Sequence, residues 1–359
     1  MKLSSRPNFR AGIALVVVMV AIFVLASMAA IFSYSMKVET KLAANGNADE
    51  QLLWLGRSGV EYARWILAQE ASIASEPYDS LNQIWAGGPG GPGETNSVLA
   101  NISLNNYPVG NGTVSLKIID LERFANINTA TAPELQQALT LMGADADSIS
   151  VVSDSILDWV QPGDSPRIAG AKNDYYQGLN PPYYCKEAPM DDLSELMLVK
   201  GVTPAMYDPE TFGNASSPFH HQLGFGGTPD EQPDYPFGLK DLFTAISSGR
   251  ININTADTNV LQLIPGVDGA AAAAIVQQRA GPDGVDGTED DTPFQNINQL
   301  TTAGVSPQVI QQAARYCTVR SSTFEVQVTA RLGDYTREYD AILFRNSGTD
   351  IQILSFYWK

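Results

Sequence analysis

The chain has 359 residues and a formal net charge of −17, from 39 acidic and 22 basic side chains. A surface of this sign repels the phosphate backbone of nucleic acids, whose binding depends on cationic side chains, so the composition argues against a nucleic-acid-binding protein. It favours divalent cations as counter-charge, and the length allows two or three domains with their own cores.

The first predicted element is a basic leader followed by an apolar helix. Lys2, Arg6 and Arg10 precede Gly12, and residues 13–32 form an uncharged run of 20 residues. As a helix this run reaches about 30 Å, the thickness of the hydrocarbon core of a bilayer. Because the leader is basic, the positive-inside tendency places the N-terminus in the cytoplasm and the rest of the chain outside. A plain N-terminal anchor is the simplest interpretation.

The helix is predicted to continue beyond the membrane. No proline occurs between residues 36 and 69, where apolar side chains recur at helical spacing among charged ones. Gly46, Gly56 and Gly59 weaken the helix without breaking the pattern. Residues 87–93 (GGPGGPG) are typical of a linker without regular structure.

Two blocks of strand signal follow, far apart in the sequence. Apolar residues alternate with polar ones over residues 114–118, after a Gly-Asn-Gly turn, and again over residues 324–332. A Gly-Asp turn at 333–334 leads into a returning strand over 335–344, and residues 351–358 form a last strand. We expect one sheet with a large insertion in a hairpin connection, because such insertions are thermodynamically cheap.

The insertion contains an internal repeat. Residues 126–130 (NINTA) recur as residues 252–256. The first copy is followed by a capping box formed by Thr131 and Glu134, and the second by Asp257 as a helix cap. Each copy therefore predicts a small helical unit.

The second copy resembles a helix-hairpin-helix unit, with its hairpin at residues 265–269. DNA-binding versions present backbone N–H groups and basic residues to a phosphate, but here Asp268 lies at the tip and Arg279 is the one basic residue of the following helix. We interpret the unit as a packing element. An exported DNA-binding or DNA-uptake protein that uses the hairpin near Gly266 is the alternative.

Two acidic loops are candidate Ca²⁺ sites, since Ca²⁺ takes six to eight oxygen ligands and glycine-rich turns expose carbonyls. The candidate ligands are Asp158, Asp164 and Asp174 in the first loop, and Asp283, Asp286, Glu289, Asp290 and Asp291 in the second. Neither spacing is that of an EF-hand. A solvated acidic turn is the alternative for each loop.

Other reactive side chains are few. Cys185 and Cys317 are the only cysteines, and a disulfide between them stays open for an oxidising compartment. The only histidines, His220 and His221, are adjacent in a loop at residues 212–237 and form a poor chelate. No nucleophile elbow, HExxH or phosphate-loop motif occurs, so we expect no catalytic residues and no enzyme activity.

The order of these features resembles a known family. The basic leader ending in glycine and the apolar helix are similar to those of type IV pilins and type II secretion pseudopilins. The insertion is similar to that of the general secretion pathway protein K family. The matching segments are NINTA in both copies, ILDW at 156–159, GAKNDYY at 170–176, EL at 195–196 and LVKG at 198–201. The resemblance extends over essentially the whole chain.

The resemblance implies an α+β fold in which a long transmembrane and amphipathic helix packs on a pilin-like antiparallel sheet. An inserted all-α domain of two halves, similar to sterile-alpha-motif and helix-hairpin-helix units, would carry structural Ca²⁺. The implied segments are a prepilin leader (1–12), a transmembrane helix (13–36), the first part of the pilin-like domain (37–123), the two halves of the insertion (124–248 and 249–317) and the C-terminal strands (318–359).

The resemblance also implies maturation and a place in an assembly. A prepilin peptidase would cut after Gly12 and methylate Ile13 at the inner membrane, with the bulk of the chain in the periplasm; an uncleaved Gly12 would indicate a simple anchored binding module. Most members carry Glu at the fifth mature position, where this chain has Val17. A carboxylate in the bilayer is costly unless paired. Val17 therefore suits the tip of the pseudopilus, beside minor pseudopilins I and J, where the chain would initiate assembly and support protein export.

Overall fold

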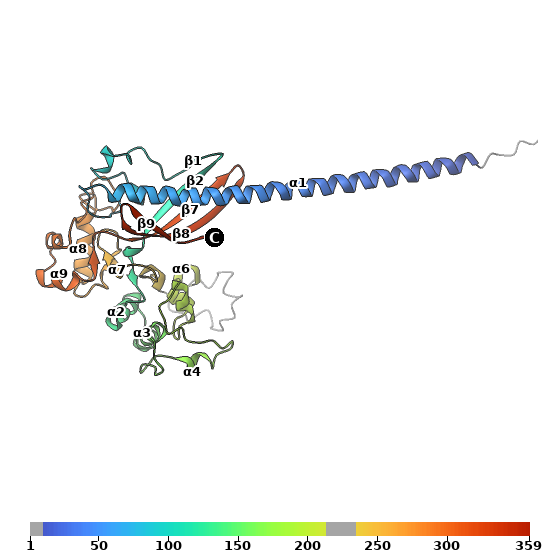
Figure 1. Cartoon of the computed structure of the whole chain (residues 1–359). Helices are drawn as coiled ribbons and strands as arrows, with labels where there is room; N and C mark the ends of the chain where they lie inside the picture. The colour runs from blue at the N-terminus through green and yellow to red at the C-terminus, as the bar shows by residue number, and fades with distance from the viewer. Residues whose placement is uncertain (1–9, 213–234) are drawn as a thin grey trace, which may run out of the picture.

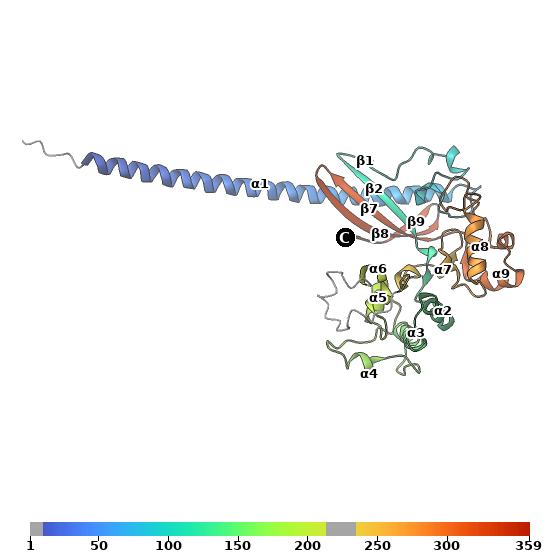
Figure 2. The same ribbon diagram turned by 180° about the vertical axis from the view of Figure 1, so that it is seen from behind.

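One long helix, α1 (Arg10–Ala71), extends far beyond the folded part of the molecule (Figures 1 and 2). This computed structural model describes residues 10–212 and 235–359, and side chains within those ranges except at residues 10–13 and 44. Residues 14–43 are exposed, and an 18-residue window of α1 reaches a mean hydropathy of 3.0 with none of it buried. Within the described ranges, α1 is the one helix long and apolar enough to cross a membrane.

The second half of α1 packs against the folded domain. Its buried side chains recur every three or four residues on one face, as an amphipathic helix requires. They are Leu52, Leu55, Val60, Ala63, Ile66 and Leu67. Val38 and Leu42 continue the same apolar pattern in the sequence but are exposed, so the packed face begins at Ala48.

Five strands form one antiparallel sheet in the order β1-β2-β7-β8-β9. The strands are β1 (Tyr107–Val109), β2 (Gly112–Asp120), β7 (Thr323–Leu332), β8 (Tyr335–Ser347) and β9 (Asp350–Trp358). β2 pairs with β7 from Thr113 opposite Arg331 to Asp120 opposite Phe324, although residues 121–322 separate the two strands. The predicted single sheet interrupted by a large insertion is confirmed.

Two glycines of α1 set the distance between the helix and the sheet. A Cβ atom at Gly56 would lie 2.6 Å from Cε2 of Tyr339 on β8. One at Gly59 would overlap Val328 of β7 and lie 3.3 Å from Cδ2 of Leu116 on β2. The helix therefore approaches the sheet more closely than side chains at these two positions would permit.

The insertion consists of short helices in two halves, each closed by a two-residue parallel strand pair. In the first half, β3 (Ala125–Asn126) pairs with β4 (Phe243–Thr244), and in the second, β5 (Ile251–Asn252) pairs with β6 (Cys317–Thr318). Among its described residues, the first half contains the helices α2 (Ala132–Met142), α3 (Ala146–Val160), α4 (Asn173–Tyr176), α5 (Pro204–Tyr207) and α6 (Pro209–Phe212), with 3₁₀ turns η3 (Leu121–Arg123), η4 (Leu193–Leu198) and η5 (Leu239–Asp241). The second half contains α7 (Thr258–Leu261), α8 (Gly269–Arg279), η6 (Ile297–Ala303) and α9 (Pro307–Ala313).

Two hydrophobic cores hold the molecule together. One lies between α1 and the sheet, where Trp85 packs edge-on against Phe324 with ring centroids 5.4 Å apart. The other runs through both halves of the insertion without interruption, from Ile127 in the first half to Cys317 in the second. The two halves therefore share one core.

Residues 87–93 contain no helix or strand, as predicted, but they form a packed loop and not a free linker. This segment lies between two 3₁₀ turns, η1 (Ile84–Ala86) and η2 (Glu94–Asn96), and both Trp85 and Glu94 are buried. The N–H of Gly91 donates to Oε2 of Glu94 at 2.7 Å, and a Cβ at Gly91 would overlap the carboxylate of Glu76. The glycines are present because the loop closes tightly around acidic side chains.

Candidate functional site

The residues predicted for processing and assembly lie in the extended half of α1. Gly12 and Ile13 are in its first turns, and their side chains are outside the described ones. Val17 is 61% exposed, in a continuous exposed apolar surface over residues 14–32. An apolar surface of this size is typical of contact with lipid or with other helices. His220 and His221 fall outside the described residues.

The second asparagine of each NINTA sequence makes the same pair of hydrogen bonds to a distant loop, which confirms the internal repeat. In the first copy, Asn128 accepts from the N–H of Met190 at 2.7 Å and donates to its carbonyl at 2.9 Å. In the second, Asn254 accepts from the N–H of Phe294 at 2.9 Å and donates to its carbonyl at 2.9 Å. Each asparagine side chain thus pairs with both the N–H and the carbonyl of one loop residue, as the backbone of a neighbouring strand would.

Asn252 joins the insertion to the sheet domain. Its side-chain amide donates to the carbonyl of Asp79 at 3.0 Å, to Oδ2 of Asp120 at 3.1 Å and to Oγ of Ser321 at 2.9 Å. Asp120, the last residue of β2, also accepts from Oγ1 of Thr255 at 2.5 Å and from Oγ of Ser321 at 2.7 Å. The repeat therefore positions one asparagine between the end of β2 and the segment that joins β6 to β7.

Buried charges complete this junction. Burial raises the pKa of Asp120 to about 7, and the negative charge of Glu122 adds to the shift. Arg345 pairs with Asp79 in the interior, and the guanidinium also donates to the carbonyl of Ser321 at 2.7 Å. Removing one member of such a buried pair is strongly destabilising, so this network fixes the insertion on the sheet.

The first predicted Ca²⁺ loop does not bring its carboxylates together in the described part of the chain. Asp158 is buried and pairs with Arg167, whose guanidinium is 2.7 Å from Oδ1 and whose N–H is 2.9 Å from Oδ2. Asp164 and Asp174 are exposed. Arg167 therefore supplies the positive charge beside Asp158 that the sequence analysis assigned to Ca²⁺.

The second predicted Ca²⁺ loop brings some of its carboxylates close together. Oγ1 of Thr288 donates to Asp290 at 2.8 Å and lies 3.2 Å from Asp291, while Asp290 also accepts from the N–H of Asp283 at 3.0 Å. Asp286 instead pairs with Arg279 at 2.7 Å, and Glu289 is exposed. Burial raises the pKa of Asp291. Two of the five predicted carboxylates, those of Asp290 and Asp291, thus lie beside Thr288, whereas that of Asp283 accepts from the N–H of Val285 at 2.8 Å.

The hairpin of the second half has no basic side chain directed to a phosphate. Asp268 caps α8 by accepting from the N–H of Ala271 at 2.8 Å. Arg279, the one basic residue of α8, is 4% exposed and donates to the carbonyls of Ile253 and Ala256 at 2.8 and 2.7 Å. The hairpin is therefore a packing element, and the DNA-binding alternative is not favoured.

The disulfide left open by the sequence is not formed. Cys185 and Cys317 are both free and buried. Cys185 belongs to the first half, where its thiol donates to the carbonyl of Asp158 at 3.6 Å, whereas Cys317 lies in β6 of the second half. Burial raises the pKa of both thiols, that of Cys317 to about 12.

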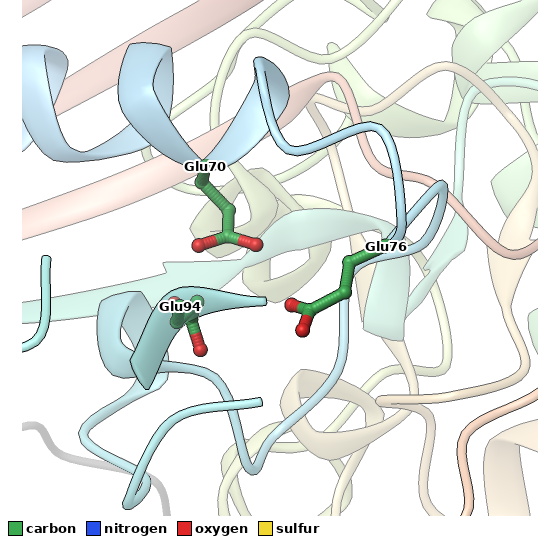
Figure 3. Close-up of side chains that lie close together, drawn as sticks. All are labelled: Glu70, Glu76 and Glu94. Carbon is green, nitrogen blue, oxygen red and sulfur yellow. The ribbon is translucent and has the colours of Figure 1, made fainter. Parts of the chain in front are cut away.

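A cluster of three buried glutamates escaped the sequence analysis. Glu70 at the end of α1, Glu76 in the following loop and Glu94 in η2 direct their carboxylates toward one another (Figure 3). One oxygen from each lies within 4.8 Å of the others, and no other group of three His, Cys, Asp or Glu in the described ranges does so. No sequence pattern indicates this cluster, because the three residues are spread over a segment whose composition is typical of a solvated loop.

Comparisons with known proteins agree with this architecture. Residues 111–209 match the family model described as type II secretion system (T2SS), protein K, and residues 247–318 match that of the helix-hairpin-helix motif. The type II secretion system protein K of Aeromonas hydrophila is 24% identical over 217 residues, which span 55% of this chain and 60% of that protein. A chain in the crystal structure of the GspK-GspI-GspJ complex from the type 2 secretion system of enterotoxigenic Escherichia coli has a similar fold. Its TM-score is 0.62 at 17% identity, covering 88% of this chain and 99% of that one.

Proposed function

We propose that this chain, a member of the type II secretion system protein K family, is the minor pseudopilin at the tip of the secretion pseudopilus. There it initiates assembly and supports protein export across the outer membrane, by contacts and not by catalysis. The proposal depends on the two different halves of α1. The first half is apolar and exposed, and the second half packs against a folded domain. Such a helix is suited to lipid before assembly and to neighbouring helices afterwards.

The position at the tip rests on two further features. The inserted helices lie on the side of the molecule remote from the apolar half of α1 and widen it there (Figure 1). A mass of this width fits the end of a narrow fibre better than its shaft. Val17 agrees, because a tip subunit has no neighbour above it whose amine a carboxylate at this position would meet. The tip assignment would be abandoned if Val17→Glu left secretion and tip-complex stability unchanged while Val17→Ala impaired both.

We propose minor pseudopilins I and J as partners, because the similar solved chain belongs to the GspK-GspI-GspJ complex. The outer face of packed α1 offers aromatic contacts, since Trp54 is 58% exposed and the guanidinium of Arg57 lies 5.2 Å from its ring centroid. Trp54→Ala should reduce co-purification of I and J with the full chain. Trp358→Ala, which removes an exposed tryptophan of β9, is the matched control and should leave co-purification unchanged.

Maturation at the inner membrane is part of the proposal. A prepilin peptidase would cut after Gly12 and methylate Ile13, leaving the folded domains in the periplasm. Mass spectrometry of the purified chain tests this directly. A methylated Ile13 at the N-terminus is expected, and an intact Met1 would contradict the assignment to an assembled pseudopilus.

We also propose that the loop at residues 283–291 binds Ca²⁺. The hydroxyl of Thr288 brings the carboxylates of Asp290 and Asp291 together, and the carboxylate of Asp283 belongs to the same loop. Within the described ranges, no lysine or arginine forms an ion pair with any of the three. The positive φ of Gly284 and Gly287 allows the turns that point carbonyl oxygens inward.

A further inference from the structure

We infer that Glu70, Glu76 and Glu94 form a binding site for one divalent cation of the Ca²⁺ type, which ties the end of α1 to the loop that covers the sheet. The site lies in the sheet domain and is separate from the acidic loops of the insertion. It goes beyond the proposed function, because it concerns how the assembly helix is anchored within the chain.

The first argument is charge. The three side chains are 2%, 3% and 0% exposed, and within the described ranges none of them forms an ion pair with a lysine or arginine. Buried carboxylates without a counter-charge carry a large desolvation cost. A divalent cation would offset most of the formal charge of −3 at one point.

The second argument is the pattern of hydrogen bonds. The N–H groups of Gly93, Ile84 and Gly91 hold the carboxylates of Glu76 and Glu94 in place at 2.6 to 3.2 Å. Glu70 differs, because its Oε1 accepts from the side-chain amide of Gln83 at 2.5 Å while its Oε2 has no partner. A buried, unpartnered carboxylate oxygen directed into an acidic cluster marks the position of a missing positive charge.

The third argument is distance. Two oxygens bound to one Ca²⁺ at about 2.4 Å each are at most about 4.8 Å apart, which is the limit that the three carboxylates satisfy. All three residues supply oxygen, the ligand that hard cations prefer. Backbone carbonyls of the surrounding glycine-rich loop would complete the coordination.

The consequence of binding would be mechanical. Glu70 ends the packed part of α1, while Glu76 and Glu94 flank η1, whose Trp85 packs on Phe324 of β7. One cation would therefore join helix, loop and sheet core. The alternative is a cluster that protonates instead, since burial and the adjacent Glu94 raise the pKa of Glu70.

The test uses the full chain in detergent micelles and the variant Glu70→Gln, which keeps the oxygen bonded to Gln83 and replaces only the unpartnered one. Titration calorimetry should show one Ca²⁺ fewer for the variant than for the wild type. At a hundredfold excess over Kd, Ca²⁺ should raise the unfolding temperature of the wild type by about 5 °C more than that of Glu70→Gln. When a chelator removes Ca²⁺, Glu70→Gln should have a higher unfolding temperature than the wild type, because the variant contains one buried charge less.

Two controls separate this site from others. Glu61→Gln, an exposed position on the same helix, should behave as the wild type, and Asp290→Asn should leave the difference caused by Glu70→Gln intact. As a readout independent of stability, Tb³⁺ emission sensitised by tryptophan should appear with wild type, fall with Trp85→Phe and be displaced by Ca²⁺. An unchanged Ca²⁺ stoichiometry and unchanged thermal shift in Glu70→Gln would overturn the inference. So would stabilisation of the wild type by acid alone, without dependence on the cation.

Discussion

The close approach of α1 to the sheet gives a prediction in which two chemically identical substitutions have opposite effects. Replacing glycine by alanine in a helix raises intrinsic helix stability by about 1 kcal/mol. At Gly46 the new methyl group has no neighbour within 4 Å, so the gain is kept. At Gly59 it would overlap Val328, whose β-branched side chain is stiff in a strand, and crowd Leu116 at 3.3 Å.

The change in the free energy of unfolding follows from the gain in helix propensity and the cost of steric overlap. Overpacking a core by one methyl group costs about 1–3 kcal/mol, so Gly59→Ala should destabilise the chain by about 1–2 kcal/mol after the gain in helix propensity. Gly46→Ala should stabilise it by up to about 1 kcal/mol. Adding Val328→Ala to Gly59→Ala opens space for the methyl group, and the double-mutant cycle should give a favourable coupling of about 1–2 kcal/mol.

Urea unfolding of the full chain in detergent, followed by tryptophan fluorescence, measures the free energies of unfolding of the wild type, the two glycine variants, Val328→Ala and the double variant. The reasoning is refuted if Gly59→Ala stabilises the chain as much as Gly46→Ala does. It is also refuted if the cycle shows no coupling between residues 59 and 328, because the destabilisation would then not arise from their contact.

Three further predictions concern the insertion and its junction. Asn128→Ala and Asn254→Ala should each lower the free energy of unfolding by about 1–3 kcal/mol, since both leave a buried N–H and C=O of the facing loop unpaired; equal stability to wild type in urea unfolding would contradict this. The raised pKa of Asp120 means that the folded state holds a proton more tightly than the unfolded state, so its contribution to stability is greatest below about pH 4 and declines as the pH rises to about 7. Asp120→Asn should flatten that part of the pH profile of the unfolding temperature, and an unchanged slope would exclude Asp120 as its source. The double variant Asp283→Asn and Asp290→Asn should bind one Ca²⁺ fewer than the wild type in titration calorimetry. An unchanged number of bound Ca²⁺ ions would mean that the 283–291 loop is a solvated turn.

The sheet and the long helix were predictable because their signals are local. The alternation over residues 324–332 and the apolar spacing of α1 each repeat several times within one element, so that no distant residue is needed to interpret them. The capping box of Thr131 and Glu134 is equally local, and the structure contains it as predicted, with the N–H of Thr131 2.6 Å from Glu134.

The features that were missed depend on contacts between distant residues. Strands β3 to β6 have two residues each, which is too short for any periodicity, and they exist only because both ends of each half meet. The glutamate cluster was hidden for a related reason. Glu76 and Glu94 flank a segment whose glycine and proline content is typical of a linker, and its order comes from hydrogen bonds to those same carboxylates.

The paired ends of the two halves have a consequence for the route by which the chain folds. Closing β2 onto β7 directly would require a loop of residues 121–322. If both halves of the insertion fold first, the β3–β4 and β5–β6 pairs reduce this connection to the short stretches at residues 121–124, 245–250 and 319–322. A tenfold shorter effective loop lowers the entropic cost of closure by about 2 kcal/mol. The insertion then acts as a folding scaffold for the sheet that carries it, and strand pairing becomes the late step that secures α1 to the domain.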